Sequence, residues 1–373
     1  MRERFYTLSA NDISVTLDLA AGHVRSFAIV ANGKIINPLY TAPWVDDAAT
    51  YGDESIPLNL RCLSGDFFCA PFAASDLDGA PLHGWPANSS WRFIGSEPHP
   101  QGGVVGRFEL EKRVLGARLI KEFTLRDHHP FLYERHIFIG GSGAVPVANH
   151  AMTKFSKGGR LFFSPKSFGE TLKIPLEPDP ARGRSYLRHA TRFTDLAKIE
   201  TQDIAVADLS RYPLSSNHED FVMLVEAAGS ELGWAAALRP AEGDMLISLK
   251  NPKTYPVTFL WFSNGGRYYP PWNGKHVGVL GIEEGRSFSA YGHKASITRN
   301  ELSDAGLPTA LELDPQGETE VRNVIGGLPL AGWTELVTVE SGGDKLILVG
   351  PGGQTRTVPY DGAFLATSDL TRS

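Results

Sequence analysis

His83 lies in residues 81–91, a segment rich in proline and tryptophan. Glycine follows the histidine directly, and prolines stand on both sides of it, which is typical of a rigid loop between strands. Binding residues concentrate on such loops, so the imidazole of His83 is a candidate ligand contact and Trp85 a candidate stacking surface. A histidine that only bonds its own turn fits the same pattern.

His150 and Glu283 are the other candidates for chemistry, because imidazole and carboxylate are the groups most used in general acid–base catalysis. His150 follows Asn149 after a short proline-containing segment, and Glu283 and Glu284 follow an apolar strand. Neighbouring residues of a strand point to opposite faces. We therefore expect one glutamate to enter a cleft and the other to be solvated. A histidine bonded to backbone and a charged strand edge are the alternatives.

Several familiar site types are absent from the sequence. It has no P-loop, G-x-G-x-x-G, H-E-x-x-H, G-x-S-x-G or C-x-x-C motif. His128 and His129 are adjacent and would diverge on a strand, so the tight metal cluster of a cupin-type isomerase is not found. A glycoside hydrolase needs two carboxylates about 5–10 Å apart, and Glu283 has no obvious partner.

Alternation of polar and apolar residues predicts the elements that must position these side chains. Residues 13–19 have a period of two, and 108–114, 117–125 and 131–139 predict a three-strand meander. Further strands are predicted at 24–30, 221–227, 233–238, 245–250, 257–262, 336–339 and 345–349.

Helices play a small part in this interpretation. No amphipathic stretch of 12 residues is found, and short helical turns are expected only near 194–198 and 302–305. Many strands must stack as sheets to bury one face each. The sequence therefore predicts an all-β fold, one large antiparallel β-sandwich domain over residues 1–373, with 326–366 as a closing C-terminal hairpin region.

Composition limits the partners. The formal net charge is −6, which argues against nucleic acid and an anionic membrane surface. Cys62 and Cys69 cannot form a disulfide framework and are expected as buried thiols. Neither a signal peptide nor a membrane span is recognisable, so we expect a cytoplasmic protein.

Together these features resemble the galactose mutarotase-like superfamily, which contains aldose 1-epimerases and hexose-6-phosphate mutarotases. The resemblance covers roughly residues 13–291 and rests on order and spacing rather than on one motif. It is carried by the strand–turn–strand at 13–30, Asn37–Leu39, Arg61, Leu82-His83-Gly84 followed by Trp91, His150, and Glu283 after a glycine and a hydrophobic residue.

The resemblance implies a supersandwich fold and interconversion of the α and β anomers of a monosaccharide or sugar derivative, without cofactor or metal. Glu283 would be the base, His150 the acid, and His83 a group that bonds sugar oxygens. Arg61, Asp66 and Asp220 would hold hydroxyls, and Trp85 or Trp261 would stack on the ring. Lys154 or Arg267 could serve a phosphate.

Two departures from the pattern keep a second hypothesis open. Glu284 stands where the family often has proline, and residues 61–72 diverge from it. A noncatalytic carbohydrate-binding protein on the same scaffold is therefore the alternative. The sugar and the oligomeric state, a homodimer included, are left open.

Overall fold

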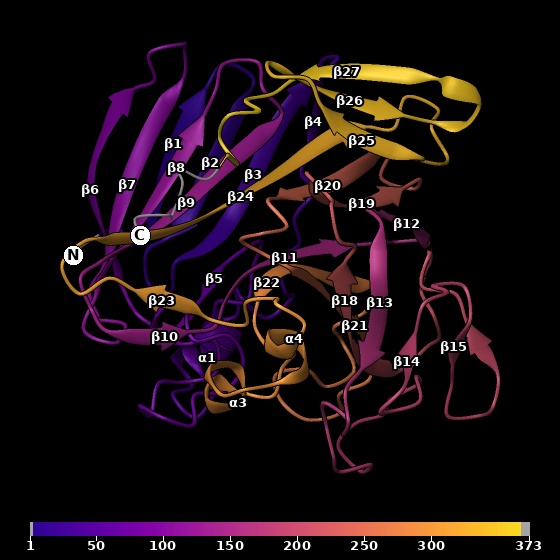
Figure 1. Ribbon diagram of the computed structural model, residues 1–373. Coiled ribbons are helices and arrows are strands. Elements are labelled where there is room, and N and C mark those ends of the chain that lie inside the picture. Colours follow the sequence, from indigo (N-terminus) through magenta and orange to yellow (C-terminus); the bar gives the residue numbers. More distant parts are fainter. Residues whose placement is uncertain (1–2, 367–373) are drawn as a thin grey trace.

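The structure is a computed structural model that describes residues 3–366, and two large antiparallel sheets form most of it (Figure 1). In spatial order the seven-stranded sheet contains β14 (Arg192–Phe193), β13 (Lys166–Thr171), β18 (His218–Glu226), β21 (Val257–Asn264), β22 (Val279–Arg286), β11 (Val147–Lys154) and β5 (Phe68–Cys69).

The nine-stranded sheet carries the predicted meander as three neighbouring strands. In spatial order it contains β17 (Arg211–Tyr212), β12 (Gly159–Phe163), β19 (Gly233–Arg239), β20 (Asp244–Lys250), β24 (Glu318–Pro329), β9 (Phe131–Ile139), β8 (Arg118–Leu125), β7 (Val104–Leu110) and β6 (Trp91–Pro98). The prediction of a large antiparallel β-sandwich is confirmed.

Smaller sheets and short helices complete the described part of the chain. The sheets are β1 (Phe5–Ala10), β2 (Ile13–Asp18), β3 (His23–Ala31) and β4 (Lys34–Ile36); β25 (Thr338–Ser341), β26 (Lys345–Val349) and β27 (Thr355–Pro359); β10 (Gly143–Val145) with β23 (Leu311–Leu313); and β15 (Ile199–Glu200) with β16 (Val206–Ala207). The helices are α1 (Ala48–Gly52), α2 (Leu58–Arg61), α3 (His293–Ile297) and α4 (Glu301–Asp304), with 3-10 turns η1 (Trp85–Ala87) and η2 (Pro351–Gly353).

The seven-stranded sheet is buried on both faces, which explains its composition. Every residue of β18 and β21 is buried. In β18, Val222 and Leu224 join the core cluster shared with the nine-stranded sheet, whereas Phe221 and Met223 join a second cluster on the opposite face. A strand covered on both sides needs apolar residues at successive positions. The second cluster is the one that borders the pocket described below.

The C-terminal segment covers the other large sheet. Residues 326–329 complete β24, and β25–β27 form the three-stranded sheet drawn in yellow (Figure 1). Its Leu346 and Leu348 pack in one cluster with Trp234 and Val324 of the nine-stranded sheet. The part of the nine-stranded sheet that contains β19, β20, β24 and β9 therefore also has an apolar layer on its second face.

The helical expectations are met in part. The turn near 302–305 is α4, whereas 194–198 contains a turn without a helix. Cys62 and Cys69 are free and buried, as predicted. Within residues 3–366 no helix has the length and hydrophobicity needed to cross a membrane.

Candidate functional site

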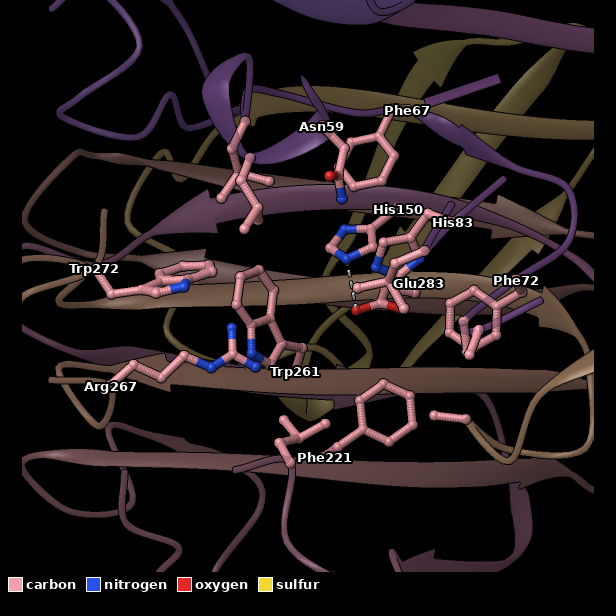
Figure 2. A pocket seen from close by; sticks show the side chains of 17 residues that line it. Asn59, Phe67, Phe72, His83, His150, Phe221, Trp261, Arg267, Trp272 and Glu283 are labelled. Atoms are coloured by element: carbon pink, nitrogen blue, oxygen red, sulfur yellow. Dashed lines mark ion pairs between the residues drawn. The ribbon is translucent and has the colours of Figure 1, made fainter. Parts of the chain in front are cut away.

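A pocket of about 240 Å³ opens on the face of the seven-stranded sheet that carries the second cluster (Figure 2). That volume is somewhat below the usual range of small-molecule sites, about 300–1,000 Å³. His83, His150 and Glu283 all line it, together with Arg267 and Asn59. The rest of the lining is mostly apolar and includes Phe67, Phe72, Phe221, Trp261 and Trp272.

Strand register brings His150 and Glu283 together. The antiparallel ladder of β11 and β22 pairs these residues directly, and directly opposed side chains of a sheet lie side by side. His150 Nε2 is 3.2 Å from Glu283 Oε1, the contact drawn as a dashed line in Figure 2. Both side chains are buried, so an imidazole and a carboxyl group meet at the floor of the pocket with little access to water.

Two glycines of β22 leave room for this arrangement. Gly281 pairs with Trp261 of β21. A Cβ at Gly281 would lie 2.9 Å from Glu283 Oε1 and 3.1 Å from Cβ of Trp261, and one at Gly285 would meet the Phe259 ring at 2.4 Å. Alternate glycines on the face of Glu283 therefore admit the aromatic side chains of the neighbouring strand. This explains the glycine that precedes the acidic residue by two positions.

Burial sets the charge state of the pair. It raises the pKa of Glu283 well above the usual carboxyl value, with a further contribution from the negative charge of Asp66. Burial, and secondarily His83, lowers the pKa of His150 well below the usual imidazole value. Both shifts favour the uncharged forms, a carboxylic acid beside a neutral imidazole, over a carboxylate–imidazolium pair. Oε1 and Nε2 lie 3.2 Å apart, so a group bound between them can contact both a proton donor and a proton acceptor.

His83 reaches the pocket from a constrained loop. His83 has φ 67°, and Gly84 has φ 73° with its backbone against Ala70, where a Cβ would lie 2.0 Å from the Ala70 oxygen. The Asn88 side-chain amide donates to the carbonyl oxygens of Leu82 at 2.8 Å and Gly84 at 2.9 Å. A non-glycine residue at positive φ is costly and is held by its surroundings. The loop therefore fixes the imidazole relative to the sheet.

The state of the His83 ring follows from its neighbours. Burial, then His23 and Arg267, lowers the pKa of His83 to about 3, so the ring is neutral near pH 7. Its Nδ1 lies 3.5 Å from Cys69 Sγ, and burial raises the pKa of that thiol well above its usual value. The Cys69 thiol keeps its proton, which gives His83 Nδ1 a neighbouring S–H group. With Nδ1 as the acceptor of this S–H group, the ring proton of His83 would be on Nε2.

Trp261, Trp272 and Arg267 line one side of the pocket, and Glu219, which is outside the lining, contacts both Trp261 and Arg267. Glu219 accepts hydrogen bonds from Trp261 Nε1 at 2.9 Å and Ser263 Oγ at 2.6 Å, and its Oε2 lies 4.0 Å from Arg267 Nε. The Arg267 guanidinium is 4.6 Å from the ring centre of Trp272, within cation–π range. This wall combines flat aromatic surface with one positive charge.

The shape of the chain matches that of known solved structures. A provisionally named aldose 1-epimerase from Escherichia coli K12 superposes with a TM-score of 0.56 at 16% identity, over 87% of this chain and 99% of the other. A provisionally named mutarotase from Salmonella typhimurium gives 0.55 at 10% identity over 87% and 90%. The fold is that of the galactose mutarotase-like superfamily. A galactose mutarotase related enzyme from Lactobacillus acidophilus gives 0.50 at 13% identity over 89% and 100%.

These likenesses concern the galactose mutarotase-like fold alone, because the identities are low. Searches with family models and among curated proteins found no match to the sequence. What the pocket does must therefore be argued from its own residues.

On this mutarotase-like scaffold Glu284 lies on the face opposite Glu283, as expected, but the expectation of a solvated carboxylate is wrong. Glu284 is fully buried and its Oε2 lies 2.6 Å from Lys250 Nζ. Thr258 Oγ1 donates to the same oxygen at 2.8 Å. Because the sheet is covered on both faces, a charge on either face must be paired.

Arg61 and Asp66 are not at the pocket, contrary to prediction. Arg61, in α2, donates from Nη1 to the Tyr51 carbonyl oxygen at 2.8 Å. Asp66 is buried between the sheets, where Asn149 Nδ2 lies 3.4 Å from its Oδ2. Its neighbour Phe67 takes the pocket side. Alternation along an extended segment explains why only one of the two can face the ligand.

Trp85 and Asp220 also lie outside the pocket lining. Trp85 packs against the main core, with Lys112 Nζ 5.1 Å from its ring centre. Asp220 accepts from His218 Nδ1 at 2.6 Å and from the backbone N–H of Leu187 at 3.1 Å. The acidic residue on the pocket face is its neighbour Glu219. Of the predicted substrate contacts, Trp261 is the one that lines the pocket.

Sequence reasoning missed Glu219 and the aromatic lining, and it named Arg267 only as a possible phosphate contact. Lys154, the other basic candidate, is exposed and lies over the Tyr40 ring at 5.3 Å. Within residues 3–366 no three His, Cys, Asp or Glu side chains are grouped to hold a metal ion. The pocket thus offers proton donors and acceptors, aromatic faces and a guanidinium.

Proposed function

We propose that this protein binds a monosaccharide in the pocket and interconverts its α and β anomers. The observation that carries the proposal is the buried contact of 3.2 Å between His150 Nε2 and Glu283 Oε1. Anomer exchange needs one proton removed from the C1 hydroxyl and one delivered to the ring oxygen, so a single couple that can accept and donate matches the reaction.

The favoured protonation state sets the order of steps. The sugar's C1 hydroxyl and ring oxygen O5 replace the contact between the two side chains. The Glu283 carboxylic acid gives its proton to O5 as the C1–O5 bond breaks, and His150 Nε2 takes the proton of the C1 hydroxyl as the C1=O bond forms. The couple is then imidazolium and carboxylate.

Ring closure restores the couple. After rotation about C1–C2, the Glu283 carboxylate takes the proton of the O5 hydroxyl, O5 attacks C1 from the other face, and His150 returns a proton to O1. This order reverses the one that the resemblance implies for opening, in which Glu283 takes the proton of the C1 hydroxyl and His150 protonates the ring oxygen. No proton is gained or lost overall.

The remaining residues support binding. Neutral His83 can donate its Nε2 proton to a sugar oxygen. Trp261, held by its hydrogen bond to Glu219, offers a flat surface for the apolar face of a sugar ring. The apolar lining keeps water from the couple, which strengthens each polar contact inside.

Exchange spectroscopy by NMR tests the proposal directly. Wild-type protein is added to a panel of aldoses, neutral and anionic, and the rate between anomer signals is compared with the spontaneous rate. We expect a protein-dependent increase for at least one sugar. If a sugar binds, as seen by line broadening, and no sugar exchanges faster than it does spontaneously, the noncatalytic binding protein is the correct function.

A further inference from the structure

Arg267 places at the pocket a guanidinium whose Nε has no hydrogen-bond partner, although the Glu219 carboxylate lies at ion-pair distance. Its side chain is 15% exposed and lies beside Trp261 and Trp272, with ring centres at 5.7 and 4.6 Å, and these two rings pack edge to face with each other. Figure 2 shows it extending alongside Trp261 into the pocket. Among the described residues no acceptor lies within hydrogen-bonding distance of it, since the Glu219 carboxylate is 4.0 Å from Nε.

The hydrogen-bond donors of the Arg267 guanidinium are not all paired. A guanidinium has five N–H donors in a planar fork, and Nε of Arg267 is buried without a partner. Two aromatic rings restrict the orientation of the fork, which lowers the entropy lost when an acceptor binds. The remaining N–H edge is suited to a planar group with two acceptor oxygens, as in bidentate arginine–carboxylate pairs.

The charge around Arg267 favours a monoanion. Arg267 is the only Lys or Arg side chain among the described residues that line the pocket. Dianionic phosphate groups are usually cradled by several donors, such as backbone N–H groups and more than one basic residue. Here one guanidinium is already partly offset by Glu219, so a second negative charge on the ligand would be left unpaired.

We propose that the ligand of this pocket is a sugar acid, whose carboxylate is bound by the fork of Arg267 while its anomeric end meets His150 and Glu283. The inference rests on the proposed function for the anomeric end only. Its closest chemical probes are hexuronates such as galacturonate and glucuronate, which differ from galactose and glucose by a carboxylate at C6.

Calorimetric titration of matched sugars at constant ionic strength tests the inference. We expect each hexuronate to bind at least about tenfold, and up to about 150-fold, more tightly than its neutral parent, the range for a hydrogen bond to a charged group. Arg267→Gln should remove this preference, and Arg267→Lys, which keeps the charge without the fork, should retain only part of it. Lys154→Gln is the matched control and should keep it whole.

Equal affinity for a hexuronate and its parent hexose would overturn the inference. So would a preference for hexuronate that survives Arg267→Gln in a variant with the wild-type melting temperature. Tighter binding of the hexose 6-phosphate than of the hexuronate would also overturn it. Anomer exchange is measured on the same samples. If neutral sugars bind and exchange as well as hexuronates, the inference of a sugar acid is wrong and the proposed anomerisation stands. If hexuronates bind through Arg267 but their anomers do not exchange faster than spontaneously, the proposed anomerisation is wrong and the inference of a sugar acid stands.

Discussion

Glu283→Gln should reduce the catalysed rate of anomer exchange by about 10²–10⁴-fold, the usual contribution of a general acid or base. Glutamine keeps the shape of the side chain but can neither release a proton to O5 nor take it back. His150→Gln should cost about as much, because the C1 hydroxyl then loses its acceptor. Affinity for the sugar should change little in Glu283→Gln, and exchange spectroscopy with titration measures both.

The two substitutions should not be additive. When two residues act as a unit, removing either one already abolishes most of their joint contribution to the rate. The double variant should therefore be about as slow as the slower single variant. Glu200→Gln, on the surface hairpin β15–β16, is the matched control and should retain the wild-type rate. Multiplied effects in the double variant would contradict a shared proton and indicate two independent roles.

Glu284→Gln should lower the free energy of unfolding by about 3–5 kcal/mol, the cost of removing one partner from a buried ion pair. Lys250 Nζ lies 2.6 Å from Glu284 and 3.0 Å from Glu226 Oε1, and Lys166 shares Glu226. The substitution leaves two buried ammonium groups with one carboxylate. Urea unfolding should show a lower midpoint with an unchanged slope.

The control again is Glu200→Gln, which removes an exposed ion pair with Arg188 at 2.6 Å and should cost no more than about 1 kcal/mol. The anomer-exchange rate per folded molecule should stay at the wild-type level in Glu284→Gln, because this side chain faces away from the pocket. A stable Glu284→Gln protein with no catalytic rate would mean that the catalytic glutamate has been assigned one residue too early.

The fold could be predicted because period-two alternation marks the strands that have one solvated face, as at residues 13–19. In β18 both faces are buried, so alternation does not show to which face of the sheet each side chain points. Polar residues at Glu219 and Asp220 then look equivalent in sequence, although only Glu219 lies on the face of β18 that carries the pocket residue Phe221. Asp66 and Phe67 present the same difficulty, since either could have been the residue on the pocket side.

Of the three residues expected to act on the sugar, His83 and Glu283 stand in unusual settings, beside Gly84 and two residues after Gly281, whereas His150 was proposed from its order and spacing relative to them. The aromatic wall had no such signal, because Phe72, Phe221 and Trp272 resemble ordinary core residues. The solvated Glu284 was an expectation drawn from strand alternation alone. It could not include Lys250, which reaches Glu284 from β20 of the other sheet.

The pH dependence of kcat/KM for anomer exchange tests the central claim most directly, because it reports the ionisations of the free protein. The pKa of His150 is lowered well below 6.5 and that of Glu283 is raised well above 4.5. We expect a protonated Glu283 and a neutral His150 on both sides of pH 6.5, so catalysis by the wild type should be flat through that value. It should fall in stronger acid, where His150 gains a proton, and in alkali, where Glu283 loses one. Catalysis that declines as the pH rises through about 6.5, the ordinary imidazole value, or no rate above the spontaneous one at any pH, would contradict a neutral proton-sharing pair as the catalyst.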